Sequence, residues 1–134
     1  MPTVSRVPTW DLDEHGFYCP GDWTRAQLIR FANEMDPHVP EGRETAIDLG
    51  IVRAVKTLRD YGIETFESCE GGRGHAFSEP TVRFAGRAAE GWRALSVCLT
   101  YGFPVSDLRR YWTIATNGEP SGPDWELVFR RRLT

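Results

Sequence analysis

The chain lacks the features of a secreted, membrane-bound or broadly nucleic-acid-binding protein. It has only three cysteines, an odd and widely spaced set that indicates reduced thiols and no disulfide framework. Its apolar stretches are broken by charge or glycine, and the start MPTVSRVPTW lacks the apolar middle of a signal peptide. A net charge of -3 argues against a basic nucleic-acid-binding face. We therefore expect a cytoplasmic protein with no membrane and no nucleic-acid partner.

Lysine is almost missing: of sixteen basic residues, Lys56 alone is not arginine. The arginine fork suits phosphate and carboxylate recognition, although a GC-rich genome explains the same bias. The length of 134 residues predicts one domain, 1–134, with an irregular arm or hairpin over residues 1–21. A homo-oligomer is compatible with the sequence, but no coiled-coil pattern indicates one.

Apolar residues at helical spacing predict three helices. The first covers about residues 22–35, the second about 44–61 and the third about 88–101. The third helix would turn Trp92, Leu95, Cys98 and Leu99 toward the core, and Trp125 of the last strand would also lie in the core.

Four segments rich in β-branched and aromatic residues predict strands. They are IETFES (63–68), PTVRFAG (80–86), RRYWTIAT (109–116) and DWELVFRR (124–131). The last two flank NGEPSGP, whose length fits a hairpin loop. This order predicts an α+β domain, with a mostly antiparallel sheet of about four strands and helices packed on one face.

The loop SCEGGRGHAFSEP, residues 68–80, is the strongest candidate for a site. Its glycines permit positive φ, and successive amides in such a turn can form a concavity that binds anions. Arg73 or Arg83 would clamp a phosphate, Ser68 and His75 would orient it, and Trp112 would stack on a ring. The expected ligand-binding residues are Ser68, Cys69, Gly71, Gly72, Arg73, Gly74, His75, Arg83 and Trp112. A long hairpin connection that uses glycine only to bend remains the structural alternative.

Two other chemistries fit the same loop. Cys69 and His75 could act as nucleophile and base, although the sequence shows no third group that orients the imidazole. Together with His15 and Cys19 they could instead hold a structural zinc, although the spacing is poor for a zinc finger. Our main prediction includes no metal, no other cofactor and no catalytic residue.

The run GIETFESCEGGRGHAFSEPTVRFAG, with EGWRALSVCLTYGFPVSDLRRYW and GPDWELVF, resembles a family of small proteins from tailed bacteriophages and prophages. The resemblance covers about residues 44–131. A fainter likeness is to the tRNA wybutosine-synthesis methyltransferase-like family, and it implies a shared fold, not a shared activity. The positions that fit it are Ser68, Cys69, Gly71, Glu79, Pro80, Gly102 and Phe103.

A phage origin implies a function by analogy. Compact phage proteins with a preformed, anion-friendly pocket resemble proteins that sequester bacterial immune nucleotides, and such a protein would act in the host cytoplasm. We therefore expect a small-molecule binding protein that holds a phosphate-bearing, nucleotide-like ligand in the 68–75 loop. The alternative is a Cys69- and His75-dependent enzyme acting on a nucleotide or its ester.

Overall fold

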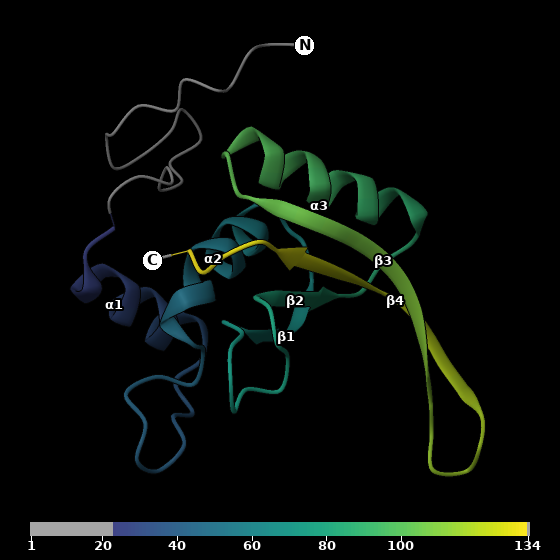
Figure 1. Ribbon diagram of the computed structural model, residues 1–134, viewed down its shortest axis with the longest axis horizontal. Coiled ribbons are helices and arrows are strands. Elements are labelled where there is room, and N and C mark those ends of the chain that lie inside the picture. Colours follow the sequence, from purple (N-terminus) through teal and green to yellow (C-terminus); the bar gives the residue numbers. More distant parts are fainter. Residues whose placement is uncertain (1–22, 134) are drawn as a thin grey trace.

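The computed structural model describes residues 23–133, in which one four-stranded sheet is accompanied by three helices (Figure 1). The helices are α1 (Arg25–Met35), α2 (Val52–Asp60), preceded by a 3-10 turn (Leu49–Ile51), and α3 (Ala88–Thr100). The strands are β1 (Thr65–Cys69), β2 (Thr81–Phe84), β3 (Val105–Ile114) and β4 (Pro120–Phe129). Their order is β1-β2-β4-β3, and all three pairings are antiparallel. The α+β prediction is confirmed.

The core lies between the helices and one face of the sheet. Alternate residues of β2 and β4, which are Val82, Phe84, Leu127 and Phe129, are fully buried. They share one hydrophobic cluster with side chains of all three helices, which include Leu28, Phe31, Val55, Leu58, Ala94 and Cys98. Burial of such alternate strand residues against helical stripes is the main stabilising term of this architecture. Within residues 23–133, no helix has both the length and the apolar character needed to cross a bilayer.

The first helix begins two residues after the start of the described chain. Thr24 caps it, because its hydroxyl accepts from the Gln27 amide while the Gln27 side chain accepts from the Thr24 amide. This capping box satisfies amides that have no partner inside the helix. The predicted arm, including His15 and Cys19, lies outside the described residues.

The second helix starts later than the sequence pattern predicts. Residues 44–48 form an irregular segment, in which the Thr45 hydroxyl donates to the Ile47 carbonyl at 2.7 Å. Asp48 turns its carboxylate to the backbone N–H of Glu70, which donates to Oδ2 at 3.0 Å. Ile47 is still buried, so it matches the apolar stripe without being helical. The side-chain bonds of Thr45 and Asp48 compete with the helix and delay its start.

The third helix faces the sheet with a side that matches the predicted one only in part. Trp92 and Leu99 are 65% and 60% exposed, whereas Ala94 and Cys98 are fully buried. The reason is the close approach of helix and sheet at Gly91, where an added Cβ would lie 2.6 Å from the Trp125 ring. Small residues allow this contact, so the larger Trp92 is left on the solvent side. The prediction was wrong for Trp92 and Leu99 and correct for Cys98 and Trp125.

The sheet face away from the helices carries a row of charges that crosses all four strands. Arg83 on β2 pairs with Glu67 on β1 at 3.1 Å and with Glu126 on β4 at 2.9 Å. Arg109 on β3 approaches Glu126 to 3.6 Å. The pKa of Arg83 lies above its ordinary value: burial opposes the charged form, but the Glu126 hydrogen bond and the neighbouring negative charges outweigh it. We call Glu67, Arg83, Glu126 and Arg109 the charge ladder.

The buried thiol of Cys98 predicts a loss of stability in alkali. Burial raises its pKa to about 12 from an ordinary value of 9.0, so the folded state keeps the thiol proton after the unfolded chain has lost it. Stability contributed by the neutral thiol is complete below pH 9 and falls as pH rises toward 12, by about 1.4 kcal/mol for each pH unit. Urea unfolding at pH 8 to 10.5 should show a steeper fall in wild type than in Cys98→Ala. Parallel curves would contradict the assignment.

Candidate ligand-binding site

The loop between β1 and β2 borders a cavity with polar and charged lining residues. The chain leaves β1 at Cys69 and returns at Thr81, and the irregular segment before the 3-10 turn lies beside it. Between them is a space of about 480 Å³. We call it the loop cavity, and its lining consists of Arg43, Ala46, Asp48, Ser68, Cys69, Glu70, Gly74, His75 and Ala76.

The glycines shape the loop by bonding inside the protein. The Gly71 amide donates to the Cys69 sulfur at 3.4 Å, and the Gly72 amide donates to the Ser78 carbonyl at 2.9 Å. The His75 amide in turn donates to the Gly72 carbonyl at 3.1 Å. The expectation that the Gly71 and Gly72 amides receive an anion is therefore not met in this conformation, because both N–H groups already have acceptors.

Four side chains with reactive or ligating atoms meet at the cavity. Asp48, Cys69 and His75 each offer one donor atom, and these three atoms all lie within 4.8 Å of one another. The imidazole Nδ1 is 3.6 Å from Asp48 Oδ2, and Nε2 is 3.6 Å from Glu70 Oε2. Cys69 is buried, whereas the His75 side chain is 30% exposed and reaches solvent. The floor of the cavity thus joins a thiol, an imidazole and two carboxylates.

Both carboxylates already have cationic and amide partners. Arg43 donates to Asp48 Oδ1, and Arg132 approaches Glu70 Oε2 at 3.3 Å. The Gly50 amide donates to Glu70 Oε1 at 2.9 Å, and Arg132 also donates to the Gly71 carbonyl at 2.7 Å. Partners of this kind keep charged oxygens in place and lower the cost of their partial burial.

The structure brings together part of the predicted site. Ser68, Cys69, Gly74 and His75 line the loop cavity, whereas Gly71, Gly72 and Arg73 are not part of its lining. Within the loop, Gly71 is buried and Arg73 is exposed.

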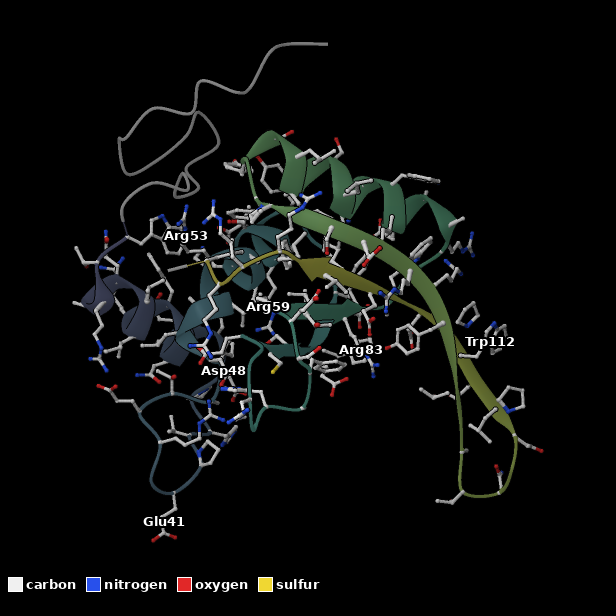
Figure 2. All side chains as sticks on the ribbon, in the orientation of Figure 1. Glu41, Asp48, Arg53, Arg59, Arg83 and Trp112 are labelled. Atoms are coloured by element: carbon white, nitrogen blue, oxygen red, sulfur yellow. The ribbon has the colours of Figure 1, made fainter. Side chains whose placement is uncertain are left out.

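Arg83 and Trp112 lie elsewhere. Arg83 belongs to the charge ladder, with its guanidinium 4.8 Å from the Phe77 ring centroid and 4.5 Å from that of Tyr111. Trp112 is 57% exposed on β3. Figure 2 shows it on the long β3–β4 hairpin, far from Asp48. The alternation of side chains along β2 places Arg83 on the outer face of the sheet, and the length of the β3–β4 hairpin places Trp112 far from the cavity. Neither feature can be read from the loop motif.

The two alternative chemistries receive different support. Asp48 supplies the third group that a Cys69–His75 pair needs, yet the ring nitrogens lie beside Asp48 and Glu70, not in a chain from carboxylate to thiol. Two of the four predicted zinc ligands lie in the described part of the chain, where Cys69 and His75 are close together. His15 and Cys19 are outside residues 23–133.

Several cavity residues escaped the sequence analysis. Glu70 lies inside the quoted motif but received no role. Asp48 sits within a segment whose apolar periodicity predicts a helix, and Arg43 and Arg132 carry no motif. No local signal distinguishes these three, because packing of distant segments brings Arg43 and Asp48 to the cavity and Arg132 to Glu70.

No known protein family, curated protein or solved structure was found to match this chain.

Proposed function

We propose that this protein binds a small molecule with a phosphate-type group in the loop cavity. The observation that carries the proposal is the cavity itself: about 480 Å³ of space lined by Arg43, Ser68, Gly74 and His75. This size falls within the range of small-molecule sites, and the lining combines a guanidinium, a hydroxyl and an imidazole. Those groups are hydrogen-bond donors suited to anionic oxygens.

Arg43 is the cation best placed to take such a group. Its side chain is 45% exposed and is held by Asp48, so it is both oriented and accessible. His75 and Ser68 would complete the contact from the opposite loop. Arg132, tied to Glu70, would add long-range positive potential without direct contact.

The rest of the ligand has room beyond the phosphate. A second cavity of about 250 Å³ shares Arg43, Asp48 and Glu70 with the loop cavity and adds Glu44, Thr45 and Leu49. Neither lining includes a tryptophan, tyrosine or phenylalanine, so stacking on Trp112 is not part of the proposal. A nucleotide-like ligand, and its sequestration by a phage protein, remain predictions that rest on the resemblance.

Arg43→Ala should weaken binding of inorganic pyrophosphate by about 10- to 100-fold, because a hydrogen bond to a charged group contributes about 1.5–3 kcal/mol. Isothermal titration of the full chain would measure it. The matched control is Arg87→Ala, an exposed arginine at the start of α3, beyond the opposite end of β2. Equal weakening in both variants, or no binding by wild type, would contradict the proposal.

A further inference from the structure

The loop cavity presents three metal-ligating side chains at one point. Asp48 Oδ2 and His75 Nδ1 are 3.6 Å apart, and the Cys69 sulfur completes a set within 4.8 Å. Ligands of one tetrahedral zinc ion, each about 2.0–2.3 Å from the metal, lie about 3.3–3.8 Å from one another. A closing movement of about 1 Å at the sulfur would therefore satisfy the coordination distances.

We propose that Asp48, Cys69 and His75 bind a zinc ion at the floor of the loop cavity, with the fourth coordination position open to the cavity. A thiolate, an imidazole and a carboxylate form a mixed set that suits zinc better than the oxygen-preferring cations Mg²⁺ and Ca²⁺. Binding displaces the thiol proton of Cys69 to solvent. Zn²⁺, the thiolate and the Asp48 carboxylate then sum to zero charge.

Each of the three ligands has its own supporting partner, as built metal sites do. The Gly71 amide donates to the Cys69 sulfur at 3.4 Å, a contact that helps to fix the position of the sulfur. Arg43 holds Asp48 through Oδ1, and the Glu70 amide holds Oδ2 at 3.0 Å in a position that also faces His75. Glu70 lies 3.6 Å from His75 Nε2, where it can accept the ring proton while Nδ1 binds the metal.

Glu70 is in turn fixed from two sides. The Gly50 amide donates to Oε1, and Arg132 approaches Oε2. This carboxylate therefore orients the imidazole and is a positioning residue, not a ligand. These supporting contacts converge on one thiol, one imidazole and one carboxylate. The contacts of a solvated loop are scattered instead.

The metal also explains how a cavity with two carboxylates could accept an anion. Asp48 and Glu70 oppose a phosphate, whereas a zinc ion with an open position provides a cation for one phosphate oxygen. In the zinc-bound protein the ion takes the place of His75 as a phosphate partner, because both ring nitrogens are then engaged. This role of the metal rests on the proposed function; the metal site itself does not.

Zinc binding is tested on the full chain, stripped with a chelator and titrated with Zn²⁺ in competition with a chromogenic chelator. One equivalent should bind. Co²⁺ loading should produce a thiolate-to-cobalt charge-transfer band that Cys69→Ser abolishes and Cys98→Ala retains. His75→Gln and Asp48→Asn should weaken Zn²⁺ by more than about 100-fold, and Glu70→Gln by about 10- to 100-fold. His38→Gln, an exposed histidine outside the cavity, is the matched control.

Three results would overturn the metal site: no zinc uptake by wild type, a cobalt band unaffected by Cys69→Ser, or equal losses in His38→Gln and His75→Gln. Cys19→Ser should leave affinity unchanged, and its loss would indicate a closed four-ligand site and overturn the open position. Pyrophosphate titration of both forms separates the two proposals. Zinc uptake without pyrophosphate binding contradicts only the proposed function, and pyrophosphate binding without zinc uptake contradicts only the metal site.

Discussion

Gly71→Ala is expected to lower the free energy of unfolding by about 3–5 kcal/mol and to abolish pyrophosphate and zinc binding. The added Cβ would lie 2.4 Å from the Glu79 carbonyl carbon and 2.5 Å from the Pro80 nitrogen. Both atoms belong to the backbone, so no side-chain rotation relieves the contact. The φ of +81° adds the strain of a left-handed conformation. Urea unfolding and the two titrations would measure the result.

The matched control is Gly74→Ala, which separates conformational strain from steric contact. Gly74 has nearly the same φ, +83°, but an added Cβ there would meet no atom within 4 Å. Its cost should be only about 1–2 kcal/mol. Comparable losses in the two variants would show that the packing of Gly71 beneath the loop is not what holds the cavity in shape.

Arg83→Ala is expected to destabilise the fold by about 3–5 kcal/mol, because it leaves a partly buried carboxylate without its main partner. The Glu126 side chain is only 11% exposed, and Arg83 itself is 24% exposed. The change also removes the guanidinium that packs between Phe77 and Tyr111. Urea unfolding would show the loss. We no longer expect this variant to act on the ligand directly, since Arg83 lies outside the cavity lining.

Arg109→Ala tests the same ladder at its exposed end. Its side chain is 60% exposed and lies 3.6 Å from Glu126, so the loss should stay below about 1 kcal/mol. The double variant Arg83→Ala, Glu126→Ala should be less destabilised than the sum of the single variants, because the two residues are directly coupled. Additive losses would show that the buried pair contributes little.

Gly71 and the charge ladder stabilise different parts of the chain. The charge ladder holds β1, β2, β4 and β3 together across the face away from the helices, whereas Gly71 keeps the loop folded against the start of β2. Cys69 and His75 lie on either side of Gly71, so the distance between the thiol and the imidazole depends on that turn. Loss of binding in Gly71→Ala, with binding retained in Gly74→Ala, would show that the turn at Gly71 holds the cavity in shape.

Local order was largely readable from the sequence. Helical spacing located α1 and α3 within a few residues, and turn-rich segments located both hairpins. The sequence did not show how deeply each side chain is buried. Trp92 looks like a core residue by hydrophobicity, but Gly91 brings α3 so close to Trp125 that only small side chains fit between helix and sheet. Ile47 is buried although it lies outside the helix. An apolar residue at helical spacing therefore does not show by itself that the helix includes it.

The sequence by itself determined the α+β class and a functional loop candidate containing Ser68, Cys69, Gly74 and His75, since short-range patterns and turn chemistry are local properties. Only the tertiary structure decided which distant groups meet those residues. Asp48 reaches His75 from the segment before α2, and Arg132 reaches Glu70 from the end of the chain. The physical reason is that packing sets distances between segments, and no local pattern contains them.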